Sequence, residues 1–214
     1  MANACIEAHG IVKHFGRQEV LKGIDLTVEA GEAVGLVGNN GSGKSVLLKC
    51  LCGLMRPDQG EVRINGKGLG TDIQRAPEIG AVIEAPGFLP SKNAYDNLYA
   101  LWVLNRRVPK ENIARSIETV GLDPKSRKRV GKYSMGMRQR LGLAQALMED
   151  PSILLLDEPF NGLDKTGLKE MYALIQGLGQ RGATMIVASH NPGDIDQLCA
   201  KVYEIDAGRM ERVR

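Results

Sequence analysis

The stretch VGNNGSGKS at residues 37–45 constrains this chain more than any other part of its sequence. It has the spacing G-x-x-x-x-G-K-S, with Gly38, Gly43, Lys44 and Ser45 at the fixed positions. Glycines let backbone N–H groups turn inward around an anion, and a helix that follows presents its positive N-terminus to that anion. An apolar run precedes the loop, and the apolar residues that follow it have helical spacing: Val46, Leu47, Leu51 and Leu54. Strand, loop and helix in this order predict a phosphate-binding site.

The phosphate loop and a second segment, SILLLDEP, together predict the chemistry. All of the loop is expected to bind phosphate: Gly38, Asn39, Asn40, Gly41, Ser42, Gly43, Lys44, Ser45 and Val46. Lys44 would reach the terminal phosphates and Ser45 would ligate Mg²⁺. SILLLDEP is an apolar strand that ends in Asp157 and Glu158, at the strand end where open α/β sheets bind ligands. We expect Asp157 in the Mg²⁺ shell and Glu158 as the base that accepts a proton from water. The alternative is that Glu158 is an exposed acid that caps the next segment.

Apolar strands alternate with helices over most of the chain, which predicts an α/β fold with a buried parallel sheet. The first third instead alternates apolar and polar residues, which is typical of antiparallel strands. From Pro86 to about Leu147 the pattern is helical, including a helix from about Met135 to Met148. We therefore expect one domain over 1–214: a core from about 1–85 and 148–214, and a helical insertion from about 86–147.

Composition limits the partners that the chain could have. The 214 residues carry a net charge of +3, which is too small to indicate a nucleic-acid or lipid surface by itself. The four cysteines show no C-x-x-C spacing, and the histidines are scattered, so we expect no zinc site. The longest apolar runs fall far short of the ~18 residues needed to span a bilayer. We expect a soluble, cytoplasmic protein.

One basic cluster is interpreted as a solvated face near a helix start; it comprises Lys125, Arg127, Lys128, Arg129, Lys132, Arg138 and Arg140.

Five motifs occur in an order that resembles the nucleotide-binding domain of ATP-binding cassette (ABC) transporters. They are the phosphate loop, YSMGM at 133–137, LLLDEP, NGLD and the SH at 189–190, and the likeness covers nearly the whole chain. The resemblance implies a P-loop NTPase (RecA-like) parallel-sheet core with an antiparallel β subdomain and a helical insertion subdomain. It implies ATP and Mg²⁺ as ligands, ATP hydrolysis, and a homodimer closed around two ATP molecules. It also implies that the partner is a polytopic transmembrane permease, which attaches the chain to the cytoplasmic face of the membrane. Nucleic acid is not expected as a partner.

The resemblance assigns the YSMGM segment to the partner's ATP site. In the family this signature lies at a helix N-terminus, where a serine and a glycine face the γ-phosphate held by the other subunit. Ser134 and Gly136 match those positions, whereas Met135 and Met137 replace a glycine and a glutamine. Ser134 is also a good N-cap, and a helix N-terminus attracts an anion. The alternative is an ordinary helix cap with both methionines packed inward.

Four further residues match positions with known roles in the family. Phe15 matches the aromatic residue that stacks on adenine, although it could instead be a core phenylalanine. Asp164 matches the loop residue that couples the two ATP sites. His190 matches the switch histidine that bonds the γ-phosphate and orients water with Glu158. Glu84 stands where most members carry a glutamine that contacts Mg²⁺.

We expect Glu84 to ligate Mg²⁺ through its carboxylate, which also adds like charge beside Asp157 and Glu158, so one of these groups could have a raised pKa. The alternative is that Glu84 points to solvent and that Pro86, Phe88 and Leu89 alone couple this loop to the permease.

The segment VIEAPGFLP followed by NAYDNL resembles the branch that includes bacitracin- and lantibiotic-type exporters. The function implied is an ATPase subunit that powers export of a peptide, antibiotic or other hydrophobic compound. The alternative is a soluble ABC ATPase that acts on nucleic acid or ribosomes; such proteins usually carry coiled-coil arms or two cassettes. A regulatory module without turnover is a further alternative, opposed by the presence of Glu158 and His190.

Overall fold

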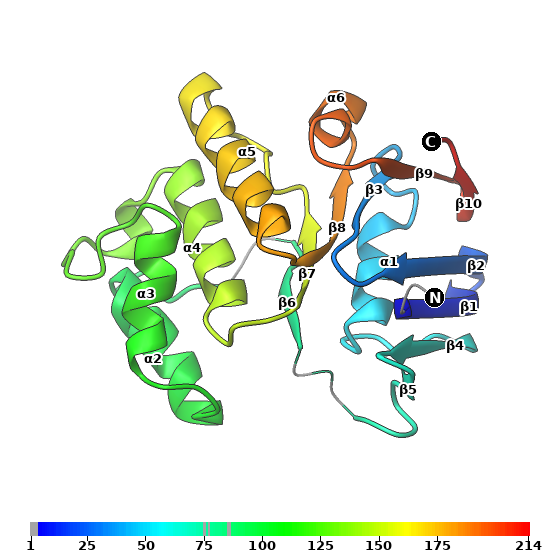
Figure 1. Ribbon diagram of the computed structural model, residues 1–214, viewed down its shortest axis with the longest axis horizontal. Helices are drawn as coiled ribbons and strands as arrows, with labels where there is room; N and C mark the ends of the chain where they lie inside the picture. Colours follow the sequence, from blue (N-terminus) through cyan, green and yellow to red (C-terminus); the bar gives the residue numbers. More distant parts are fainter. Residues whose placement is uncertain (1–3, 75, 77, 85–86) are drawn as a thin grey trace.

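The computed structural model describes residues 4–74, 76, 78–84 and 87–214, which form an α/β fold around a six-stranded sheet (Figure 1). The strands of this sheet are β3 (Ala33–Val37), β6 (Ile79–Val82), β7 (Ile153–Asp157), β8 (Thr184–Ser189), β9 (Lys201–Asp206) and β10 (Arg209–Arg212). Their order is β10-β9-β3-β8-β7-β6. All neighbours from β9 to β6 are parallel, and β10 pairs antiparallel with β9 at the edge. The predicted parallel sheet is confirmed; the short strand β6 was not predicted.

A four-stranded antiparallel sheet lies beside the large one, as predicted. Its strands are β1 (Ala4–Phe15), β2 (Gln18–Glu29), β4 (Gln59–Ile64) and β5 (Lys67–Gly68), in the order β2-β1-β4-β5. Helix α1 (Lys44–Leu51) lies between the two sheets and shares one apolar core with both. Leu54 does not belong to that helix, contrary to the predicted apolar face. The chain leaves α1 at Cys52, Gly53 turns at φ +77°, and Leu54 is left exposed.

Helices cover the other face of the large sheet. They are α2 (Ala94–Asn105), α3 (Glu111–Thr119), α4 (Met135–Leu147), α5 (Lys165–Gln180) and the short α6 (Pro192–Asp196), with a 3₁₀ turn η1 (Val130–Lys132) before α4. Helices α2, α3 and α4 lie together on the side of the sheet away from the antiparallel strands (Figure 1). The expected start of the helical insertion, Pro86, lies outside the described residues. No helix in the described part of the chain is both long and apolar enough to cross a bilayer.

Strand β7 shows why its sequence is apolar without a break. Leu154 and Leu156 belong to the core under the helices, whereas Ile153 and Leu155 belong to the core shared with α1 and the antiparallel sheet. Successive side chains of a strand point to opposite faces, and both faces of this strand are buried. Because the strands are parallel, their carboxyl ends meet at one edge, where a ligand site is expected.

Candidate functional site

A pocket of about 310 Å³ opens where the predicted phosphate loop meets the end of β7. The loop from Asn40 to Val46, Phe15 at the end of β1, and Asp157 and Glu158 form its wall. Strand pairing explains the convergence, because Val37 before the loop lies opposite Ser189, and Asp157 lies opposite Ala188. The structure therefore brings together groups that are more than a hundred residues apart in the sequence.

The loop needs its glycines for geometric reasons. Gly43 has φ +114°, and a Cβ there would lie 2.9 Å from Leu21 Cδ2. A Cβ on Gly38 would lie 2.2 Å from the carbonyl oxygen of Ile205. Lys44 begins α1 and is buried, and its Nζ donates to the carbonyls of Gly38 (2.6 Å) and Asn39 (3.1 Å). The ammonium group is thus held inside the curve of the loop.

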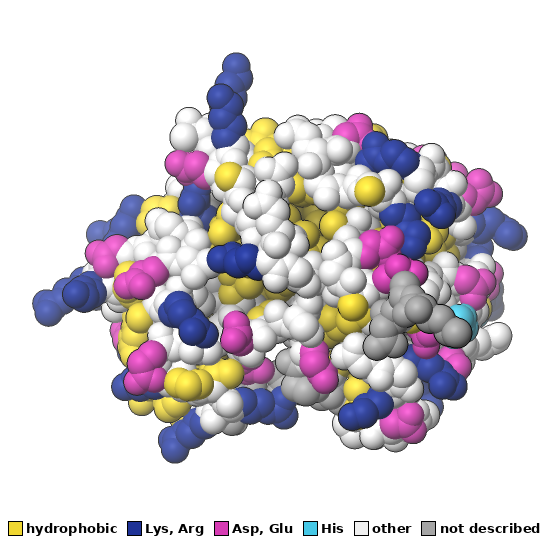
Figure 2. Space-filling model, viewed as in Figure 1, with side chains coloured by type: hydrophobic (Ala, Val, Ile, Leu, Met, Phe, Trp, Pro, Cys, Tyr) yellow, Lys and Arg dark blue, Asp and Glu magenta, His cyan; other side chains and the backbone are white. Residues whose placement is uncertain are grey.

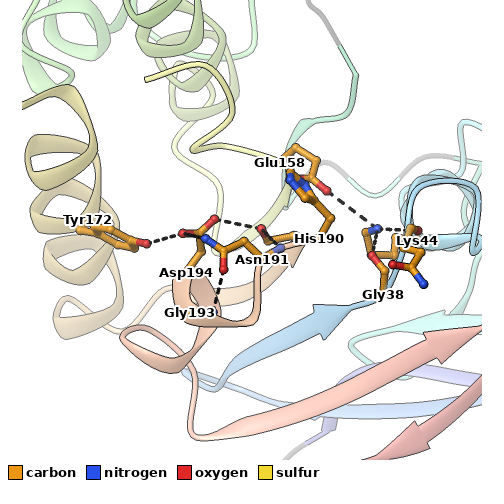
Figure 3. A network of polar contacts seen from close by, with 10 residues as sticks. Gly38, Lys44, Glu158, Tyr172, His190, Asn191, Gly193 and Asp194 are labelled. Atoms are coloured by element: carbon orange, nitrogen blue, oxygen red, sulfur yellow. Dashed lines mark hydrogen bonds and ion pairs between the residues drawn. The ribbon is translucent and has the colours of Figure 1, made fainter. Parts of the chain in front are cut away.

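Glu158 lies between the phosphate loop and the end of β8 (Figure 3). Its Oε2 is 2.8 Å from His190 Nδ1, and its Oε1 is 3.8 Å from Lys44 Nζ. The backbone of Glu158 has φ +49°, in the left-handed region that a non-glycine residue adopts at a cost of about 1–3 kcal/mol. A hydrogen bond from Glu158 N to Ala188 O (2.9 Å) helps to hold it there. Glu158 and His190, to which the resemblance assigns a shared role toward water, are therefore in direct contact.

Three buried oxygens of this pocket form no hydrogen bond within the described part of the chain: Ser42 Oγ, Asp157 Oδ1 and Glu158 Oε1. Buried polar atoms are normally paired, so unpaired ones that line a pocket fit a polar ligand. Burial raises the pKa of Asp157, and the charges of Glu158 and Glu84 raise it further, against the hydrogen bond from Ser45 and the charge of Lys44. Burial is the main cause of this rise, and the neighbouring carboxylates that the sequence suggested make a smaller contribution to it.

A magnesium ion would depend on the ligand for part of its coordination. Among the described residues, no three His, Cys, Asp or Glu side chains are grouped to hold a metal ion alone. Mg²⁺ typically takes one or two carboxylates and completes its shell with phosphate and water. Ser45, which hydrogen-bonds Asp157, and the free Oδ1 of that carboxylate fit such a site.

Glu84 lies two residues after β6, and its carboxylate accepts a hydrogen bond from Lys49 of α1. Its side chain is 63% exposed, and its backbone has φ +61°. Glu84 is near enough to affect the pKa of Asp157, but its oxygens do not line the pocket wall. Of the alternative coupling residues, Phe88 packs partly against the core and Leu89 is exposed, whereas Pro86 lies outside the described residues.

Phe15 is not a core residue. Its side chain is 49% exposed, and it forms part of the pocket wall at the end of β1. The alternative that Phe15 is a buried phenylalanine is therefore wrong. An exposed ring beside a phosphate loop is free to stack on a planar group.

The predicted signature residues lie in a second pocket of about 320 Å³, separate from the first. Ser134 caps α4 by accepting a hydrogen bond from Met137 N (3.2 Å), and Asp164 caps α5 by accepting one from Gly167 N (2.7 Å). Ser134, Gly136 and Asp164 all line this pocket. Two helix N-termini thus open into the same surface hollow.

The two signature methionines differ. Met137 is partly buried against the core, as the alternative interpretation expected for both. Met135 is 50% exposed, and its thioether covers Gly162 so closely that a Cβ there would lie 2.6 Å from the sulfur. Met135 therefore joins the signature to the loop that leads to Asp164.

Sequence reasoning missed a polar network around His190. It joins Ser189, Asn191 and Asp194 to Tyr172 of α5 (Figure 3). Asn191 followed by Pro192 is a typical helix start, so the short helix α6 could have been predicted. No sequence signal indicated that Tyr172 would reach it.

Known proteins resemble this chain in sequence and in fold. The family model described as ABC transporter matches residues 21–161. The uncharacterized ABC transporter ATP-binding protein YybJ of Bacillus subtilis (strain 168) is 40% identical over 206 residues, which cover 96% of this chain and 94% of the relative. The bacitracin transport ATP-binding protein BcrA of Enterococcus faecalis is 36% identical over 207 residues, 96% of this chain and 67% of the relative. The dimeric post-hydrolysis structure of the ATP-binding cassette MJ0796, bound to ADP and Pi, has the same fold, with a TM-score of 0.85 and 24% identity over 98% of this chain and 99% of that one.

Proposed function

This chain belongs to the ABC transporter family as an ATP-binding, ATP-hydrolysing subunit, and from that premise we propose that two copies close around two ATP molecules and power a separate transmembrane permease. The observation that carries the proposal is the pocket in which the phosphate loop, Asp157, Glu158 and Phe15 converge. We assign the nucleotide-binding core to about 1–85 and 148–214, and the signature-bearing helical subdomain to about 86–147.

The position of each pocket residue, and of His190 next to Glu158, indicates its role in ATP binding or hydrolysis. The loop amides and Lys44 bind the β- and γ-phosphates, and Phe15 stacks on the base. Ser45 and Asp157 would hold Mg²⁺, which when bound neutralises charge on the phosphates. Glu158 takes the proton of the attacking water. His190, 2.8 Å from Glu158, bonds the γ-phosphate and orients that water.

The second pocket supports a dimer. Ser134, Gly136 and Asp164 open to the surface at two helix N-termini, apart from the phosphate-loop pocket of the same chain. A helix N-terminus favours an anion. In our proposal, the signature of one copy completes the ATP site of the other, and Asp164 couples the two sites.

A surface hollow with two exposed leucines supports a permease as partner. Leu54 and Leu104 are 72% and 79% exposed, and with Leu101 and Ala81 they line a pocket of about 390 Å³ beside β6. Exposed apolar patches mark interaction sites. By contrast, Lys and Arg are interspersed with Asp and Glu over the face shown in Figure 2, which does not favour nucleic acid. We propose that the permease docks at this hollow and holds the protein at the cytoplasmic face of the membrane.

We propose that the cargo is a peptide antibiotic or another hydrophobic compound moved outward, because relatives at 36% identity are bacitracin transport proteins. The test is affinity purification of the tagged chain from crosslinked membranes, followed by identification of its partner. Recovery of one polytopic protein, which also stimulates ATP hydrolysis, is the expected result. Recovery of ribosomes or nucleic acid instead would support the soluble alternative and contradict this proposal.

Glu84 gives a prediction about coupling. Glu84→Gln should keep ATPase activity and permease stimulation near wild type, because an amide oxygen can replace a carboxylate oxygen toward Mg²⁺. Glu84→Ala should keep ATP binding but weaken the stimulation. ATPase rates with and without the co-purified permease, across a Mg²⁺ titration, measure both. An alanine variant with unchanged stimulation and unchanged Mg²⁺ dependence would show that Glu84 only pairs with Lys49.

Phe15 gives a prediction about base stacking. Phe15→Ala should remove about 1–3 kcal/mol of stacking, which weakens ATP binding roughly 5-fold to 150-fold. The fold should tolerate the change because the side chain is half exposed. Calorimetric titration with ATP measures the loss. Inorganic tripolyphosphate, which has no base, is the control and should bind both forms equally; an equal loss for both ligands would contradict the stacking role.

A further inference from the structure

Tyr172 of α5 contacts both of the segments that carry the proposed catalytic pair. Its ring stacks on Phe160, two residues after Glu158, with the ring centroids 4.4 Å apart. Its hydroxyl donates to Asp194 Oδ1 (2.7 Å), four residues after His190. Tyr172, Phe160 and Asp194 are all buried. One side chain thus ties the loop after β7 to the segment after β8.

The Asp194 carboxylate in turn holds both neighbours of His190. Ser189 Oγ donates to Asp194 Oδ2 (3.0 Å), and Asn191 Nδ2 donates to Asp194 Oδ1 (3.0 Å). The backbone N–H of Asn191 also donates to Ser189 Oγ (3.1 Å). His190 is therefore the middle residue of a tripeptide fixed on both sides, while its own ring points away toward Glu158 (Figure 3).

The character of these bonds suits a positioning role. Burial and the neighbouring Asp194 raise the pKa of Tyr172, so its hydroxyl keeps the proton that it donates. Hydrogen bonds to a buried carboxylate are stronger than neutral ones and fix geometry tightly. Asp194 itself does not line the phosphate-loop pocket, and neither does Tyr172. They can affect the reaction only through the residues that they hold.

We propose that Tyr172 and Asp194 are positioning residues that set the His190 ring against Glu158 for hydrolysis. The inference rests on the proposed roles of Glu158 and His190. Helix α5 begins at Lys165, directly after its cap Asp164, and its second turn ends near Tyr172. One helix therefore connects the loop that we propose faces the dimer partner to Tyr172. A shift of α5 would therefore move the His190 segment and the Glu158 loop together.

The test compares variants that change single groups. Tyr172→Phe removes the hydroxyl but keeps the ring on Phe160, and Asp194→Asn keeps the volume but removes the charge. We expect each to lower kcat about threefold to tenfold, the usual worth of a buried hydrogen bond, with the KM for ATP within about twofold of wild type. Tyr95→Phe in α2 is the matched control and should change neither constant.

A double-variant cycle shows whether the effect passes through His190. In a His190→Ala background, Tyr172→Phe should change the remaining single-turnover rate by less than about 1.5-fold, because the group that it positions is absent. Thermal unfolding of each variant shows that the chain is folded. A role limited to stability would lower the unfolding midpoint and leave kcat at the level of Tyr95→Phe, which would overturn the inference.

Two further outcomes would also overturn it, and they separate it from the proposed function. If Tyr172→Phe multiplies the loss caused by His190→Ala, Tyr172 does not act through His190; the proposed function then stands. If His190→Ala hydrolyses ATP at the wild-type rate, the role proposed for His190 fails, and the positioning inference fails with it.

Discussion

Glu158→Gln is expected to lower kcat for ATP hydrolysis by about 10²- to 10⁴-fold while ATP binding is kept. The amide has the shape of the carboxylate, and its oxygen can still accept a hydrogen bond from His190 Nδ1. It cannot take a proton from water, however, so the chemical step loses its base. The phosphate loop and Asp157 are unchanged, which preserves binding.

The same variant should trap the dimer, because ATP that is bound but not cleaved keeps the two copies closed. Gel filtration with Mg²⁺ and ATP should show a dimer for Glu158→Gln and mostly monomer for the wild type after turnover. Glu118→Gln, an exposed position on α3, is the matched control and should behave as wild type. Hydrolysis by Glu158→Gln at the wild-type rate would show that another group is the base.

Most of the fold could be predicted because its signals are local. The phosphate loop has a fixed spacing, and strands such as β7 are apolar throughout because both faces are buried. The carboxyl ends of parallel strands share an edge, so the meeting of the loop, Glu158 and His190 followed from the motif order. Strand β6 was missed because IGAV is too short to show a period.

The remainder depends on contacts that sequence does not encode locally. Whether Phe15 is exposed depends on how the antiparallel sheet packs. In the structure its side chain is 49% exposed. The contact of Tyr172 with Asp194 joins residues 22 apart on two helices, and no periodicity predicts it. The same holds for Met135 over Gly162. Side-chain pairs between elements are fixed by packing, after the elements themselves have formed.

The position of Ser134 predicts a second large loss of ATPase activity on substitution. Ser134 and Gly136 line a pocket that contains no residue of the phosphate loop of their own chain. If they bind γ-phosphate, the phosphate must come from another copy. Ser134→Arg would fill that helix N-terminus with a bulky cation, and loss of the cap would cost only about 1 kcal/mol, too little to unfold the chain. Lys44→Ala would remove the cation from the other half of the site.

Each of these two variants alone should therefore be nearly inactive, whereas their mixture should recover activity. A heterodimer has one site with the intact Lys44 loop of one chain and the intact Ser134 of the other. Random pairing of equal amounts makes half of the dimers mixed, so about a quarter of the sites are restored. Mixing Ser134→Arg with a chain that carries both substitutions is the matched control, and it should restore nothing. If heterodimers form, as shown by pull-down with two tags, and the first mixture is as inactive as the control, then Ser134 does not complete a partner's site, and the two pockets function within single chains.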